Sequence, residues 1–217
     1  MAAPLVLASA SPRRRRLLEQ LGVAVEVRPA GVPEEDADGP VPERVLTLAH
    51  LKAAAVAAEM DDGFVLAADT LGALDGVALG KPRGAQEAMQ MLWRMADRTH
   101  DVFTGVVALR VEGGRIVREA TDVVCTKVTF RPLTVGQLRD YLATEDYEDK
   151  AGGYGIQGAG RALVAGLDGP YTNVVGLPVA ATLRLLAELG YPIPETDPEA
   201  AERRLDAFQG TATEARR

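Results

Sequence analysis

LVLASASPRRRRLLEQLG, residues 5–22, is the stretch that decides the fold. Leu5–Ala8 is a short apolar run typical of a buried strand. A helix is expected over residues 12–21, because the fixed φ of Pro12 suits the first helical position and Ser11 stands where an N-cap should be. A strand that turns directly into a helix, in a chain that repeats this alternation, predicts an α/β fold.

Four consecutive arginines open this helix. Positive charge at a helix N-terminus opposes the macrodipole, which favours anions at that end. Free backbone N–H groups, two serine hydroxyls and guanidinium groups at a strand-to-helix turn can together form a phosphate site. We therefore expect Arg13 or Arg14 to meet a phosphate, whereas Arg15 and Arg16 fit a solvated basic face.

Composition sets broad limits on the class of protein. A chain of 217 residues can form one large α/β domain or two small lobes that share a sheet. The net charge of −7 argues against broad nucleic-acid binding but leaves room for a local basic pocket.

The single cysteine, Cys125, lies in an apolar run and cannot form an internal disulfide, so we expect a packed side chain and a reducing compartment. No apolar run reaches the roughly 18 residues that span a membrane, and we expect a cytoplasmic protein.

Strand-like and helix-like stretches alternate along the rest of the chain. Further strands are expected at residues 23–28, 64–68, 71–74, 77–79, 102–111 and 116–130. Hairpin turns are expected at Asp75-Gly76 and Glu112–Gly114. Further helices are expected at residues 42–60, 84–95, 134–143 and 177–189. We place one domain over residues 1–194, and a tail over 195–217 that is either a short extra helix or a frayed end.

Polar clusters stand at strand ends or in glycine-bearing loops, where α/β folds gather functional groups. They are Ser9, Ser11, Arg13 and Arg14; Asp69 and Thr70; Lys81 between Gly80 and Pro82; and residues 149–158. Singly, each is compatible with a simpler role: a turn cap, a surface lysine, a flexible linker. Together they offer cations for a polyphosphate, carboxylates for a divalent cation or a water, and an amide for a base edge, which fits phosphoanhydride hydrolysis. The Walker A and GxGxxG patterns are absent.

These motifs together closely resemble the Maf family of nucleoside triphosphate pyrophosphatases, from Leu5 to about Gly190. The matching blocks are residues 7–14 (LASASPRR), 68–70 (ADT), 80–82 (GKP), 100–105 (HDVFTG), 149–158 (DKAGGYGIQG) and 173–178 (NVVGLP). The resemblance implies a fold like that of inosine triphosphate pyrophosphatases, in which a long mixed sheet flanked by helices divides two lobes around a central cleft. It also implies hydrolysis at the α-phosphorus to the monophosphate and diphosphate, with a divalent cation such as Mg²⁺ or Mn²⁺.

The resemblance implies roles for individual residues. Asp69 corresponds to the proton acceptor and would share the metal with Glu34 and Asp149. Arg13, Thr70 and Gln157 correspond to positions that bear on substrate choice. The residues expected to bind the substrate are Ser9, Ser11, Arg13, Arg14, Lys52, Thr70, Lys81, Lys150 and Gln157.

Two of these positions allow a second interpretation. Lys52 lies on or beside the apolar face of its helix, where a lysine more often extends its ammonium out of a core than takes part in catalysis. Pro33 stands where the family commonly has an acidic residue, so either Glu34 or Glu35 is the pocket carboxylate. Leu71-Gly72 replaces the family's usual β-branched pair, and Gly72 is expected to weaken the strand and loosen the segment that carries Asp69.

The resemblance also bears on substrate and partners. Residues 150–157 (KAGGYGIQ) resemble the branch that acts on dTTP and UTP, with modified pyrimidine nucleotides as further candidate substrates. The family is commonly dimeric, so a homodimer is expected, with no nucleic-acid or membrane partner. The competing interpretation is a nucleotide-binding regulator of cell division or septum formation with little turnover. A pure sensor would not need Asp69 and the metal-binding carboxylates.

Overall fold

The structure, a computed structural model, describes residues 4–32 and 37–206. Its centre is a mixed seven-stranded sheet in the order β2-β1-β3-β5-β6-β7, with β4 paired to β3. The strands are β1 (Leu5–Leu7), β2 (Glu26–Val27), β3 (Gly63–Leu74), β4 (Val77–Leu79), β5 (Thr99–Glu112), β6 (Arg115–Phe130) and β7 (Val164–Asp168). The predicted α/β class with a long mixed sheet is confirmed.

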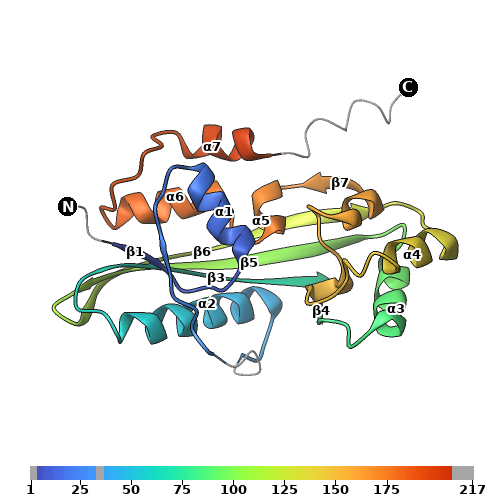
Figure 1. Cartoon of the computed structure of the whole chain (residues 1–217), viewed down its shortest axis with the longest axis horizontal. Helices are drawn as coiled ribbons and strands as arrows, with labels where there is room; N and C mark the ends of the chain where they lie inside the picture. The colour runs from blue at the N-terminus through green and yellow to red at the C-terminus, as the bar shows by residue number, and fades with distance from the viewer. Residues whose placement is uncertain (1–3, 33–36, 207–217) are drawn as a thin grey trace.

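Helices cover both faces of this sheet (Figure 1). They are α1 (Pro12–Gln20), α2 (Val41–Ala57), α3 (Ala85–Met95), α4 (Val135–Leu142), α5 (Tyr171–Val175), α6 (Val179–Glu188) and α7 (Pro198–Leu205). Figure 1 shows α2 on one face, with α1, α5, α6 and α7 on the other, while α3 and α4 lie near one end of the sheet. No helix in the described ranges is both long and apolar enough to cross a membrane.

Turn chemistry and side-chain alternation explain the central strands. Asp75 and Gly76 have φ of 54° and 77°, and Gly113 and Gly114 have φ of 55° and 72°. These positive values at both central positions are what a two-residue type I′ turn requires, so both predicted hairpins are confirmed. Because side chains alternate along a strand, β1 sends Leu7 into the core beneath α1 and Val6 into the core beneath α2.

A gap in one edge of β3 creates the space for a site. β1 pairs with β3 in parallel only as far as Leu7 opposite Leu66, whereas β4 pairs with β3 from Gly72 onward. The other edge of β3 pairs with β5 from Gly63 to Ala73. β1 and β4 must therefore share one edge, and none of the described strands pairs with residues 67–71 on that side.

Two expectations about β3 are wrong. Asp69 and Thr70 do not follow the strand but lie within it, because β5 pairs with the whole segment and continues it to Leu74. Gly72 does not loosen a loop, since it is hydrogen-bonded into the sheet opposite Leu79. A Cβ at Gly72 would lie 3.2 Å from Cδ1 of Leu79, so glycine here permits close side-chain packing.

The expected packing of Cys125 is also wrong. Thr126 and Val128 of β6 face the core, so period two places Cys125 on the exposed side of the strand. Partial desolvation and the neighbouring Asp101 raise the pKa of the Cys125 thiol, which disfavours the nucleophilic thiolate.

The C-terminal third holds the elements that the sequence did not predict. β7 and α5 are five residues each, and two 3₁₀ turns, Ala151–Gly153 and Ala159–Leu163, shape the glycine-rich segment. The expected helix over 177–189 is present as α6. Of the two alternatives for the tail, the short extra helix is confirmed as α7, while residues 207–217 lie outside the described part of the chain.

Gly105 of β5 gives a test of how α2 packs on the sheet. A Cβ built at Gly105 would lie 2.6 Å from the backbone carbonyl carbon of Val45, so Gly105→Ala must push α2 away from the strands. We expect chemical denaturation to show a loss of about 1–3 kcal/mol in the free energy of unfolding. The control is Gly166→Ala in β7, where a Cβ meets no described atom within 4 Å. Equal stability of the two variants would contradict this packing.

Candidate active site

A cavity of about 540 Å³ lies at the gap in β3, a volume that suits a small-molecule ligand. One side comes from the β1–α1 turn, α5 and the loop after α5, and the other from the end of β4 and the glycine-rich segment. These are the two sides of the expected cleft. The polar residues lining the cavity include Ser11, Arg13, Arg14, Arg16, Lys52, Asp69, Thr70, Lys81, His100, Asp146, Asp149, Lys150 and Gln157.

Lys52 and Asp69 form an ion pair within this cavity. Asp69 shares its face of β3 with Val65 and Ala67, the face that packs on α2, and Lys52 lies on the side of α2 turned toward it. Nζ of Lys52 is 2.5 Å from Oδ1 of Asp69, and the two side chains are only 14% and 10% exposed. Lys52 therefore does not extend out into solvent, and its ammonium fixes the Asp69 carboxylate at the open edge of the strand.

Arg14 is buried and connects three segments on the face of β3 opposite Asp69. Its Nε donates to the carbonyl of Gly176 at 2.7 Å, and its terminal nitrogens donate to Oγ of Ser9 at 2.8 Å and Oγ1 of Thr70 at 3.1 Å. Burial lowers the pKa of Arg14 to about 10, although the nearby Asp69 carboxylate opposes this shift. Arg14 thus remains a cation at neutral pH while it joins the β1–α1 turn, β3 and the loop after α5.

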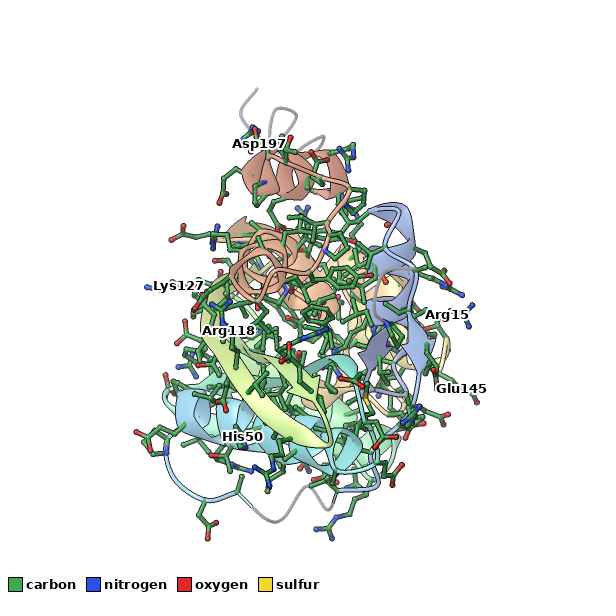
Figure 2. All side chains as sticks on the ribbon, turned by 90° about the vertical axis from the view of Figure 1, so that its left-hand side faces the viewer. Arg15, His50, Arg118, Lys127, Glu145 and Asp197 are labelled. Atoms are coloured by element: carbon green, nitrogen blue, oxygen red, sulfur yellow. The ribbon has the colours of Figure 1, made fainter. Side chains whose placement is uncertain are left out.

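Arg13 and the first turn of α1 face the cavity more openly. Pro12 begins the helix after Ser11, as predicted, yet the Ser11 side chain makes no capping hydrogen bond within the described structure. The first-turn N–H groups and the exposed Arg13 therefore lie beside the cavity, where they can donate hydrogen bonds to an anion. Arg15 pairs with Glu19 on the outer side of α1, as expected of a solvated face (Figure 2). Arg16 lines the cavity, a placement that the helix pattern alone did not indicate.

Asp146 organises the glycine-rich segment, and the sequence motifs did not single it out. Its Oδ1 lies 3.0 Å from Nζ of Lys150, and its Oδ2 accepts from the backbone N–H of Gly160 at 3.2 Å. A Cβ at Gly158 would clash with Oδ2 of Asp146, so glycine is needed there for the approach of this carboxylate. The sequence feature that could have identified Asp146 is its position four residues before Lys150 of the glycine-rich segment.

Aromatic and apolar side chains also line the cavity. Nε2 of His100 lies 2.7 Å from the hydroxyl of Tyr154, and the two rings meet edge to face with Phe130. Burial lowers the pKa of His100 to about 4 and raises the pKa of Tyr154, so both are neutral at physiological pH. Leu79, Val102 and Ile156 also line the cavity. His100 and Tyr154 stand within the sequence motifs, but the sequence assigned neither of them to the site.

The structure brings the sequence-predicted residues together. All the predicted substrate-binding residues line the cavity except Ser9, which lies behind its wall and accepts hydrogen bonds from Arg14 and from the N–H of Ser11. Asp69 and Asp149, two of the three expected metal ligands, also line it. Glu34 and its alternative, Glu35, lie outside the described residues.

The carboxylate side chains of the cavity determine how the protein could hold a metal ion. Over residues 4–32 and 37–206, no three His, Cys, Asp or Glu side chains gather closely enough to hold a metal. Mg²⁺ is commonly held by one or two carboxylates together with the phosphate oxygens of a substrate, rather than by an all-protein cage. The carboxylates of Asp69 and Asp149 beside a cationic cavity fit that mode of binding.

A cationic pocket with a paired carboxylate, set at the broken edge of a mixed sheet, defines an α/β protein built to hold a phosphorylated small molecule. Comparison with known families gives the particular family. The profile described as "Maf-like protein" matches residues 4–189, and the chain belongs to this family.

Curated relatives match nearly the whole chain. The chain is 49% identical over 195 residues to a protein of Anaeromyxobacter sp. (strain Fw109-5) named dTTP/UTP pyrophosphatase, which covers 89% of this chain and 93% of that protein. Proteins with the same name from Myxococcus xanthus and Moorella thermoacetica are 49% and 47% identical, covering 88% and 87% of this chain and 94% and 96% of their own lengths.

One solved structure has a weaker likeness. It is a nucleoside-triphosphatase (dITP/XTP pyrophosphatase) of Mycobacterium abscessus, with a TM-score of 0.38 and 15% identity over 60% of this chain and 75% of that chain. The sheet order and the family match carry the assignment of the fold.

The buried imidazole of His100 should make stability depend on pH. The unfolded chain binds a proton at His100 near pH 6.5, whereas the folded chain does so only near pH 4. The free energy of unfolding should therefore fall as pH drops from about 6.5 to 4, by at most about 3 kcal/mol from this residue. Urea unfolding across this range should show a shallower fall for His100→Gln. The exposed His50→Gln is the control, and equal slopes for wild type and His100→Gln would contradict the assignment.

Proposed function

We propose that this protein is a nucleoside triphosphate pyrophosphatase that hydrolyses dTTP and UTP to the monophosphate and diphosphate. The observation that carries the proposal is the Lys52–Asp69 pair, set 2.5 Å apart at the unpaired edge of β3 inside a cavity ringed by cations. The names of the curated relatives support the choice of reaction and substrate. Such an enzyme would remove nucleotides from the cellular pool.

A triphosphate suits the cationic lining of the cavity. Arg13, Lys81 and Lys150 line it, and the first turn of α1 adds backbone N–H groups. Charge-assisted hydrogen bonds to phosphate oxygens are among the stronger polar contacts in proteins. Arg14 adds its positive charge to this lining, and its bonds to Ser9, Thr70 and Gly176 hold it in place.

Asp69 is the proposed general base. It accepts a proton from a water whose oxygen forms a bond to the α-phosphorus. The bond from that phosphorus to the oxygen bridging toward the β-phosphorus breaks, and diphosphate leaves with the electron pair. Lys52 orients the Asp69 carboxylate, and the neighbouring cations offset the charge that develops on the phosphate oxygens.

A divalent cation, Mg²⁺ or Mn²⁺, is proposed as the cofactor. Asp69 and Asp149 would hold it, together with Glu34 of the segment outside the described residues. When bound, such an ion neutralises phosphate oxygens and orients the triphosphate. The proposal rests on the donor set of the cavity and on the family resemblance.

The aromatic and apolar lining of the cavity suits the base. His100, Tyr154 and Ile156 offer ring and alkyl surface, while Gln157 lines the cavity from the glycine-rich segment. The Gln157 side chain also interacts with the hydroxyl of Tyr171. Uracil and thymine present carbonyl acceptors and an imide donor, which one amide can match with two hydrogen bonds. Pyrimidines with modified rings would use the same contacts.

A nucleotide-sensing regulator of cell division or septum formation is not favoured, because a sensor has no need of a general base held by a lysine. We further propose that the enzyme is cytoplasmic and homodimeric, with no nucleic-acid or membrane partner. The domain is proposed to span residues 1–194, with residues 195–217 following it.

Replacing the general base should abolish most of the turnover. Asp69→Asn keeps the size of the side chain but removes its basicity, so we expect kcat for dTTP to fall by about 10²–10⁴-fold. Diphosphate release with saturating divalent cation measures this, and circular dichroism verifies folding. Asp75→Asn, on the exposed β3–β4 turn, is the matched control and should keep wild-type kcat. Near-normal turnover in folded Asp69→Asn would remove Asp69 from the role.

Gln157→Glu tests base choice. The wild type should hydrolyse dTTP and UTP with higher kcat/KM than CTP or the purine triphosphates, since a site built on specific hydrogen bonds rejects bases that leave its polar groups unpaired. Loss of the amide donor should weaken dTTP and UTP selectively, by about tenfold. Gln90→Glu, exposed on α3, controls for the added charge. A uniform loss across all bases would show that Gln157 does not read the base.

A further inference from the structure

Glu202 is a buried carboxylate that the proposed mechanism does not use. It lies on α7, beyond the residues 4–189 that match the family, and it is only 8% exposed. Its neighbour Ala201 is fully buried, and α7 packs along α6. Figure 1 shows α7 as the outermost helix over α6, on the same face of the sheet as α1 and α5.

The Glu202 carboxylate joins the starts of two helices. Oε1 accepts from Oγ1 of Thr172 at 2.5 Å and from its N–H at 3.4 Å, at the first turn of α5. Oε2 accepts from the N–H of Ala180 at 3.1 Å, at the first turn of α6. Pro178 holds the N-cap position of α6 and has no side-chain acceptor, so Thr172 Oγ1 accepts from Val179 N–H at 3.0 Å instead. A carboxylate is favourable at the N-terminus of the ten-residue α6, because the helix dipole is positive there.

The corner that Glu202 holds also carries the acceptors of the site's arginines. Arg13 Nε donates to the carbonyl of Val175 at 3.4 Å, and Arg14 Nε donates to the carbonyl of Gly176 at 2.7 Å. Both acceptors lie within four residues of Thr172, at the end of the five-residue α5 and directly after it. A displacement of α5 would therefore move the two carbonyl groups that accept hydrogen bonds from Arg13 and Arg14 and so position their guanidinium groups.

We propose that Glu202 is a positioning residue for the arginine turn, residues 9–14, acting through α5, and that α7 is an internal brace of the active site. The inference has two readouts. Hydrogen exchange reports the coupling directly, whereas the kinetic readout rests on the proposed function. Glu199, on the same helix but paired with Arg184 in the open at more than half exposure, supplies a matched control.

Hydrogen exchange in the full-length protein tests the coupling. In Glu202→Ala, amide exchange should rise on the order of tenfold in residues 171–180 and also in residues 9–16, since a charge-assisted contact is lost from a buried corner. Residues 41–57 of α2, on the opposite face, should keep wild-type exchange, and Glu199→Ala should resemble wild type throughout. Faster exchange confined to residues 171–180, or none at all, would reduce Glu202 to a local cap and overturn the proposal.

Steady-state kinetics give the second readout. Glu202→Ala should raise KM for dTTP about tenfold and change kcat much less, because Lys52 and Asp69 lie on the other face of β3. Glu202→Gln keeps the size and one carbonyl acceptor, so it should fall between Glu202→Ala and wild type, and it replaces Glu202→Ala if that variant does not fold. An unchanged KM, or a fall in kcat alone, would overturn the proposal. If the wild type releases no diphosphate, the proposed function fails, and the exchange result still decides the role of Glu202.

Discussion

The site depends on the early end of β1. This strand pairs with β3 over three residues and then leaves the sheet, and α1 starts at Pro12 after a short turn. A longer β1 would cover the edge of β3 beside Asp69 and fill the space that the cavity occupies. The break that ends the strand thus exposes the carboxylate and aims the N-terminus of α1 at the opening.

Consecutive residues of one strand connect the two walls of the cavity. Because side chains alternate along β3, Asp69 faces α2 and pairs with Lys52, whereas Thr70 faces the other way and contacts Arg14. A shift in the register of β3 would move both side chains to the wrong faces. The eleven pairs that link β3 to β5, from Gly63 to Ala73, hold that register and therefore the relation between the proposed base and the arginine turn.

Local signals were sufficient for much of the fold and for most of the site. Asp75-Gly76 carried its own turn chemistry, and Pro12 after Ser11 marked the start of α1. The polar clusters at strand ends and glycine loops converged on one cavity because α/β folds place such segments at one edge.

The predictions that failed depended on partners distant in sequence. The apolar run before Asp69 did not indicate that β5 would extend the strand, and the helical pattern around Lys52 could not show a carboxylate across the interface. The exposure of Cys125 follows from its register in β6, which composition does not encode. Asp146 and Glu202 act through backbone N–H groups that only the folded chain brings near.

The central claim is that this site directs a water to the α-phosphorus of a nucleoside triphosphate. Hydrolysis of dTTP in water enriched in ¹⁸O, followed by mass spectrometry of both products, tests it directly. Attack at the α-phosphorus places the label in dTMP and leaves the diphosphate unlabelled. Label in the diphosphate, or release of inorganic phosphate in place of diphosphate, would contradict the account.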